Sequence, residues 1–352
     1  MKNYLILIGV LFFGWQCQYP VDISSLPPTQ KFIGIDIKVT EDYASANVFY
    51  SLESVTINGA YILPKPPIAT ATIIDSKGNK FELSNTKGIE DTLFKGKIGE
   101  SYQVQLVADG KTYLSDKETM QASPAFDSLI VNYSRENFRP ADNLYYDGFD
   151  IYALAHDIPG VENYYQWAWV HYSRAIYCDK VYSRAEGRDV LLQCYPPDCW
   201  NIEYNQNVII QSDRLKDGNE LAQNIVRVPY ATPPKIYYIR IEQRAITPNV
   251  YAYFKSLEAS TENRGTLFDI PAQTLFSPNI ANVNDPDEKI LGVFNVFSYR
   301  KRLVTIDMNQ PINGAIPKAI MLPAPFSGDP FASAPCTEGT YRTQRKPPGW
   351  IN

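Results

Sequence analysis

Residues able to perform acid–base, nucleophilic or metal chemistry are few in this chain, and no catalytic spacing connects them. The 352 residues include two histidines, His156 and His171, and no nucleophile stands in a recognised motif beside either. The sequence lacks a Gly-x-Ser-x-Gly elbow, a P-loop, a dinucleotide-binding glycine pattern and a His-Glu-x-x-His zinc motif. We therefore predict a protein that is not an enzyme and holds no cofactor, with both histidines packed or solvated on strands.

Acidic residues number 38, so a cation site or a pair of hydrolytic carboxylates has to be considered. Two groups stand out, Asp285 to Glu288 and Asp213 with the run Asp217 to Glu220. Neither has the alternating ligand spacing of a calcium-binding loop, and solvated loops are favoured for both, so we predict no metal site. A glycosidase needs two facing carboxylates, which keeps a carboxylate hydrolase as an alternative function.

Besides Cys17, the chain has four cysteines: Cys178, Cys194, Cys199 and Cys336. An even count in an oxidising compartment predicts two disulfides. Zinc is the alternative, but Cys194 and Cys199 have four residues between them and no second pair of ligands follows the same pattern. Three pairings are open, and each of them links Cys336 to the region 178–199.

Residues 1–16 have the form of a lipoprotein signal peptide, with one cation, a short apolar run and then Cys17. The apolar run is too short to cross a bilayer as a stable helix. Gly14, Trp15 and Gln16 stand where a Leu and small residues usually precede the lipidated cysteine, a relaxation that fits Bacteroidota lipoproteins. We predict that Cys17 carries diacylglycerol and that residues 17–31 form a tether.

The composition favours a protein built mainly from β-strands and ordered loops. A formal net charge of −5 without a basic run argues against binding to nucleic acid or to anionic lipid. The content of 25 Tyr and 26 Pro favours strands and ordered loops. Short strand patterns separated by glycine turns predict an Ig-like β-sandwich over 32–119. Beyond Pro124, a larger β-rich domain with one short helix is expected over 124–352.

Local patterns give three further expectations for the strands. Asp75 to Asn79 forms a hairpin loop. Strict alternation over 102–106 places Tyr102, Val104 and Leu106 on one face of a strand. A strand over 291–298 is expected to turn at 299–302 into another strand.

The aromatic run Tyr164 to Val170 predicts a buried central strand, with a stacking platform for sugar or peptide as the alternative. The helix is expected where Thr247 can act as N-cap and Pro248 can occupy the first helical position. Apolar residues follow at helical spacing, and Gly265 lies near the predicted end.

In their order, these patterns resemble the family of Bacteroidota lipoproteins grouped as domain of unknown function 4249. The segments that carry the resemblance are Ala71 to Ile73 with the 75–78 hairpin, Gly99 to Val104, Asn163 to Tyr165, the helix with Tyr251, Tyr253 and Phe254, residues 276–280, Leu291 to Phe294, and the terminal cysteine with Lys346 to Pro348 and Trp350. The sequence Phe276-Ser277-Pro278 departs from the Asn-Pro-Phe-like sequence of the family. The resemblance implies outer-membrane lipoproteins that accompany TonB-dependent, nutrient-importing receptors, and it implies no enzymatic activity.

We therefore expect a non-catalytic outer-membrane lipoprotein that acts as an accessory or binding subunit. The expected partner is an outer-membrane β-barrel protein, either a TonB-dependent receptor or an assembly complex. A stand-alone surface protein that binds glycans or peptides is the alternative. The cell surface is favoured over the periplasmic face, although Asp22 is the one acid in the stretch that directly follows Cys17.

Binding is expected through aromatic and apolar anchors, because the chain has no basic patch and is rich in Tyr and Trp. Two Pro-rich loops, 269–287 and 309–335, could present such anchors or could cover sheet edges. Leu275 and Phe276 are the predicted interaction residues. Replacing both with Ala is expected to weaken a complex while the melting temperature stays nearly unchanged.

Overall fold

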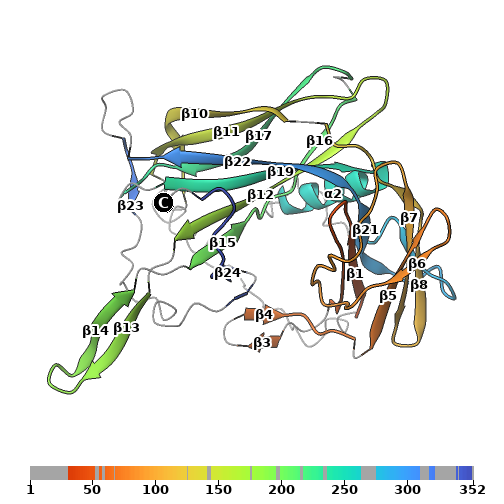
Figure 1. The fold of residues 1–352 in the computed structure, drawn as a ribbon, viewed down its shortest axis with the longest axis horizontal. Coiled ribbons are helices and arrows are strands. Elements are labelled where there is room, and N and C mark those ends of the chain that lie inside the picture. The colour runs from red at the N-terminus through yellow and green to blue at the C-terminus, as the bar shows by residue number, and fades with distance from the viewer. Residues whose placement is uncertain are drawn as a thin grey trace, which may run out of the picture.

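The computed structural model shows a mainly β protein in which two units pack around helix α2 (Figure 1). No helix among the described residues is both long and apolar enough to cross a membrane. The structure describes residues 31–51, 55–57, 60–66, 68–124, 126–140, 144–174, 177–195, 199–214, 217–232, 236–262, 275–309, 317–321, 338–339 and 341–350.

The first unit consists of two sheets that enclose one apolar core. One sheet has the order β2-β1-β21, with β1 (Ile33–Val39), β2 (Ala44–Tyr50) and β21 (Ile290–Val296). The other has the order β20-β8-β7-β5-β6 with β9 beside β7, and contains β5 (Ala69–Asp75), β6 (Lys80–Glu82), β7 (Ser101–Ala108), β8 (Lys111–Ser115), β9 (Glu118–Thr119) and β20 (Ile280–Asn282).

The first unit is therefore discontinuous in sequence. Strand β21 pairs in parallel with β1 along its whole length, and β20 adds an antiparallel edge to β8. Both strands lie in the part of the chain that the sequence analysis assigned to the second domain. The expected boundaries 32–119 and 124–352 thus do not describe how the sheets are assembled.

Two local expectations for this unit are confirmed. In the 75–79 hairpin, the Asp75 carboxylate accepts backbone hydrogen bonds from Lys77 and Asn79, and Gly78 adopts a positive φ of 84°. Along β7, Tyr102 and its alternate neighbours point into the core and are at most 2% exposed.

The second unit packs a six-stranded sheet against a three-stranded one (Figure 1). The large sheet has the order β22-β19-β12-β15-β24 with β16 beside β12, and contains β12 (Tyr164–Arg174), β15 (Trp200–Tyr204), β16 (Ile209–Ser212), β19 (Ile236–Ile246), β22 (Ser298–Asp307) and β24 (Arg342–Thr343). The small sheet has the order β10-β11-β17, with β10 (Phe126–Phe138), β11 (Tyr146–His156) and β17 (Glu220–Pro229).

Three short strand pairs complete the described chain: β3 (Val55–Ile57) with β4 (Ala60–Ile62), β13 (Tyr177–Ser183) with β14 (Arg188–Tyr195), and β18 (Ala231–Thr232) with β23 (Ile320–Met321). The β13–β14 hairpin projects away from both units (Figure 1).

The aromatic run of β12 forms the buried centre of the large sheet, as the sequence predicts. The side chains of Tyr165 and Trp167 are 0% exposed. Trp169 lies on the same face but is half-buried, at the edge of the core. The expectation of a core strand is therefore confirmed for Tyr165 and Trp167, whereas Trp169 lines a cleft that is described below.

Helix α2 (Pro248–Glu262) begins at the predicted proline. Thr247 precedes it, but its hydroxyl is buried and finds no partner in the described part of the chain, so it does not cap the helix as expected. The turn expected at 299–302 is also wrong, because Tyr299 to Arg302 lie inside β22 and pair with β19. The strands β21 and β22 are instead separated by the single buried residue Phe297, where the chain passes from one unit to the other.

Candidate functional site

A cleft of about 590 Å³ opens between the two units, and we call it the interunit cleft. Strands β1, β2 and β21 form one side, and α2 with β12 and β19 forms the other. Phe49 contributes to the floor because its ring lies on Gly34, where an added Cβ would come within 2.3 Å of the ring. The lining is Asp36, Lys38, Phe49, Gln166, Arg244, Tyr253, Phe254, Leu257, Leu275, Leu291, Gly292, Val293 and Asn295.

The charged groups of the interunit cleft are paired within the protein. Asp36 and Lys38 form an ion pair at 3.5 Å. Arg244 donates to Glu242 at 2.6 Å and to the side-chain oxygen of Gln166 at 3.3 Å. Because these charges are neutralised locally, the surface that remains for a ligand is predominantly aromatic and aliphatic.

The structure separates the two predicted interaction residues, Leu275 and Phe276. Leu275 lines the interunit cleft and is half-buried. Phe276 packs edge-on against Phe32, with ring centroids 5.6 Å apart, and forms an isolated bridge with Leu291 of β21. Leu275 is thus available to a ligand in the cleft, whereas Phe276 holds its own chain segment to the first sheet.

A second cleft, of about 850 Å³, lies where β12 changes partner, and we call it the Trp169 cleft. Strand β15 pairs with residues 170–174 of β12, whereas β16 pairs with residues 164–167 of the same strand. The chain that connects β15 to β16 therefore bulges away from β12 beside Trp169. Asn205 holds this bulge by accepting a hydrogen bond from the backbone N–H of Trp169 at 3.1 Å. Besides Trp169, the polar lining is Asn205, Gln206, Asn207, Gln223, Asn224, Arg227, Glu258 and Thr261.

Neither cleft has the acid–base chemistry of a hydrolase in its described lining. Asp36 is the one carboxylate among the described residues of the interunit cleft, and Glu258 is the one in the Trp169 cleft. Glycoside hydrolysis by paired carboxylates requires two of them facing one bond. The described lining of each cleft therefore lacks this pair of carboxylates.

The two histidines lie on strands, as the sequence predicts. His171 is 4% exposed, stacks on Tyr237 with ring centroids 3.7 Å apart, and places Nδ1 2.8 Å from the Tyr238 carbonyl oxygen. Because a carbonyl can only accept, Nδ1 carries the proton in this contact. His156 is exposed at the end of β11 and contacts the Asp127 carboxylate at 2.6 Å.

The described cysteines bear on the disulfide prediction in two ways. Cys199 is disulfide-bonded and buried. Cys178 and Cys194 stand directly opposite each other in the β13–β14 register. Directly opposed residues of antiparallel strands have Cα atoms about 4.5–5.5 Å apart, which lies within the range that disulfides span. The register is thus compatible with a Cys178–Cys194 pair, and Cys336 lies outside the described residues.

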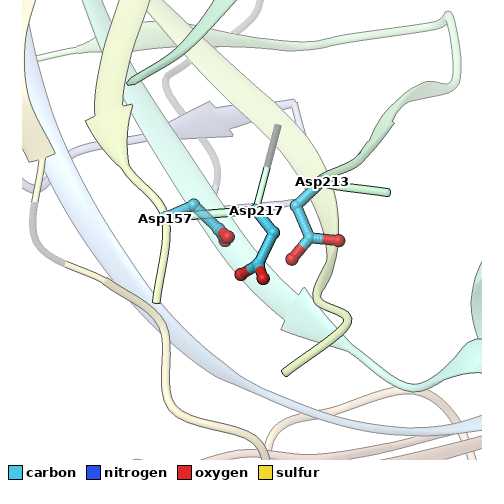
Figure 2. Close-up of side chains that lie close together, drawn as sticks. All are labelled: Asp157, Asp213 and Asp217. Atoms are coloured by element: carbon cyan, nitrogen blue, oxygen red, sulfur yellow. The ribbon is translucent and has the colours of Figure 1, made fainter. Parts of the chain in front are cut away.

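The two acidic groups noted in the sequence differ sharply in their surroundings. Glu288 accepts hydrogen bonds from Lys111 at 2.8 Å and from Asn282. Burial raises the pKa of Glu288, but these contacts outweigh burial and hold the pKa below its usual value. By contrast, Asp213 and Asp217 gather with Asp157, and Figure 2 shows the three carboxylates directed toward one another. No pattern in the sequence connects Asp157 with this group.

Three predicted features fall outside the described residues: the signal peptide 1–16, Cys17, and almost all of the tether 17–31. Most of the loop 309–335 and the first part of the loop 269–287 are likewise not described.

Comparison with known proteins identifies one family. Residues 37–302 match the family model described as "Domain of unknown function (DUF4249)". This match covers more than half of the chain and both units of the fold. No curated protein matches the chain.

Proposed function

The chain belongs to the DUF4249 family, and we propose that it acts by binding, as a non-catalytic, lipid-anchored accessory subunit of an outer-membrane complex. The observation that carries this proposal is the interunit cleft. Its charges are paired internally, and its accessible wall is formed by aromatic and aliphatic residues of α2 and β21. Such a surface suits a partner segment with apolar anchors, because interface cores are depleted of charge and rich in aromatic residues.

The position of the cleft also supports a binding role. Both walls are parts of regular elements, and the bottom is fixed by close backbone contact between β1 and β21. Gly292 has φ of 92°, and a Cβ at this position would lie 2.2 Å from the Ile35 carbonyl oxygen. A cleft built on such rigid elements binds with a small loss of conformational entropy.

The proposed location and partner follow from the N-terminal pattern and from the resemblance stated above. Cys17 is the proposed lipid site, and the proposed phylum is Bacteroidota. The proposed partner is an outer-membrane β-barrel protein, either a TonB-dependent receptor or an assembly complex. We place the protein preferentially at the cell surface.

A pull-down from native membranes in mild detergent tests the proposed complex. We expect a stoichiometric integral-membrane partner with the wild-type protein. Substituting Leu275→Ala together with Leu257→Ala is expected to weaken the complex roughly tenfold, because both side chains line the cleft. The complex should survive a salt increase that screens surface ion pairs.

Leu93→Ala is the matched control, since Leu93 is 84% exposed and does not line the cleft. Phe276→Ala provides a second comparison, because its contact with Phe32 predicts a lower melting temperature. Of the two substitutions, only Leu275→Ala is therefore expected to leave the melting temperature nearly unchanged. Recovery of no membrane protein, or equal binding by the wild type and the cleft variant, would count against the proposed role.

The anchor is tested separately by Cys17→Ser. This variant should lose fatty-acid labelling and be released from the membrane, because no other lipid attachment is proposed. A variant that stays in the outer-membrane fraction through high salt and carbonate would show that a protein contact holds it there. Intact mass with and without reduction tests the two proposed disulfides, which predict a gain of four hydrogens.

A glycan-binding role is the second candidate, and the Trp169 cleft favours it. A half-buried indole beside several amide side chains and Arg227 can stack on a sugar ring and exchange hydrogen bonds with its hydroxyl groups. Glycan-array binding that is lost in Trp169→Ala and kept in Leu275→Ala would support this role. If the wild type binds no glycan, the glycan-binding role is excluded and the role with a protein partner is favoured.

A further inference from the structure

Two loops of the second unit bring three aspartates together at one end of the fold. Asp157 directly follows β11, Asp213 directly follows β16, and Asp217 stands in the turn before β17. Each offers a carboxylate oxygen that lies within 4.8 Å of the oxygens of the other two. Asp157 and Asp213 are buried, whereas Asp217 is exposed, so the cluster opens to solvent at Asp217.

Hydrogen bonds from the surrounding loops hold each carboxylate in place. Asp157 accepts from the Tyr165 hydroxyl at 2.6 Å and from the Gly218 N–H at 3.1 Å. The Gly160 N–H donates to Asp217 Oδ1 at 2.8 Å. These contacts connect the loop 157–163 with the loop 213–219 and fix the three side chains relative to one another before any ligand arrives.

Asp213 is bound on one side and unpartnered on the other. Its Oδ2 accepts from the Asn163 N–H at 2.8 Å and from the Asn163 amide at 3.3 Å. Within the described part of the chain its Oδ1 is buried and finds no hydrogen-bond partner, and the residue as a whole is 0% exposed. Figure 2 shows one oxygen of the Asp213 carboxylate directed toward Asp217.

Among the described residues, no cation compensates the three carboxylates of the cluster. None of its three carboxylates forms an ion pair with a Lys, Arg or His of the described chain. Buried charges in folded proteins are paired or coordinate a metal, because an isolated buried charge costs several kcal/mol or more.

We infer that Asp157, Asp213 and Asp217 form a binding site for one calcium ion. Every ligand atom in the cluster is oxygen, which suits a hard cation and disfavours zinc or copper. Calcium fits better than magnesium, because it accepts irregular carboxylate sets with water completing the shell, whereas magnesium demands a near-ideal octahedron. The site is separate from both clefts and does not depend on the proposed accessory role.

The sequence could not show this site, because its ligands do not follow one another at calcium-loop spacing. Asp213 and Asp217 are separated by three residues, and their third partner Asp157 belongs to the end of a different strand. The antiparallel pairing of β11 with β17, with His156 opposite Glu220, brings the two loops together. The ligand set is therefore a product of the fold.

Calcium-dependent stability of the purified full chain tests the site. Against a chelator-treated sample, about 10 mM Ca²⁺ should raise the unfolding midpoint by about 2 °C or more, since this concentration exceeds the dissociation constants typical of extracellular calcium modules. Titration calorimetry should give one ion per chain. Terbium luminescence, excited through tyrosine, should appear because the Tyr165 hydroxyl contacts Asp157.

Asp217→Asn is the main variant, because Asp217 is exposed and its loss should not impair folding. It should abolish the calcium-dependent shift and the terbium signal, whereas Asp287→Asn, at another exposed acidic position, should keep both. The proposal is overturned if the wild type shows no shift and binds no ion, or if Asp217→Asn responds like the wild type. A larger response to Mg²⁺ than to Ca²⁺ would overturn the assignment of calcium.

Discussion

The two ends of strand β11 carry buried carboxylates in opposite circumstances. At its start, Asp147 is 4% exposed and accepts hydrogen bonds from the Tyr133 hydroxyl at 2.5 Å and from the backbone N–H groups of Glu136 and Lys318. Asp150, on the same strand, accepts from Arg227 at 2.7 Å and from Asn137 at 3.0 Å. Beyond the end of β11, Asp157 faces Asp213 and Asp217.

The two ends differ in whether the surroundings of the buried carboxylate stabilise its charged form. Burial raises the pKa of Asp147, but the donated hydrogen bonds outweigh burial and hold the pKa below its usual value. At the other end, burial and the neighbouring carboxylate raise the pKa of Asp213. The protein donates hydrogen bonds to the carboxylates at both ends, but at the far end three carboxylates also face one another, and in our proposal an external cation neutralises them. The first group is structural, and the second has the properties of a binding site.

The largest expected contrast comes from the same isosteric substitution at the two ends. Asp147→Asn places an amide N–H against groups that already donate, so we expect a loss of about 2–3 kcal/mol in the free energy of unfolding. Asp213→Asn in the presence of chelator should be neutral or stabilising. It keeps an oxygen for Asn163 and removes a charge that faces two other carboxylates. Urea denaturation of both variants measures the contrast, and two losses of equal size would refute it.

A smaller effect is expected from removing one donor at the start of β11. Tyr133→Phe takes away the hydroxyl that contacts Asp147 while keeping the ring packed against Phe149, with centroids 5.6 Å apart. We expect a loss of about 1.5 kcal/mol in chemical denaturation, typical of a hydrogen bond to a charged group. The loss should be independent of calcium. A calcium-dependent loss would mean that the two ends of β11 are coupled.

The smallest effect concerns acid stability. Because the folded-state pKa of Asp147 lies below its unfolded value, its contribution is present above the unfolded pKa of about 3.9 and is lost as the pH falls below it. The wild type should therefore lose stability between about pH 4 and pH 2 more steeply than Asp147→Asn. Thermal unfolding across this range in the presence of chelator tests the prediction, and parallel profiles for the two proteins would contradict it.

Local features of the fold could be predicted from the sequence because their determinants are local. The hairpin at Asp75 follows from turn chemistry, and the start of α2 follows from Pro248. The burial of Trp167 follows from an aromatic run that reads as a central strand. Each of these expectations rests on residues that are neighbours in sequence.

Features that depend on distant pairings could not be predicted. Nothing near Leu291 indicates that β21 will pair in parallel with β1, at the opposite end of the chain. The same limit applies to the candidate sites. The sequence indicated Leu275 but could not distinguish it from Phe276, whose role depends on contact with Phe32. It drew attention to Asp213 without Asp157, because only the fold joins them.

The comparison between the two ends of β11 rests on the claim that the far end binds calcium. A crystal grown with Ca²⁺ and measured at a wavelength that gives calcium anomalous scattering tests this claim most directly. We predict one anomalous peak between Asp157, Asp213 and Asp217, about 2.3–2.6 Å from their oxygens, and none near Asp147. A well-ordered cluster without such a peak, with Asp213 sharing a proton with Asp157, would contradict the account.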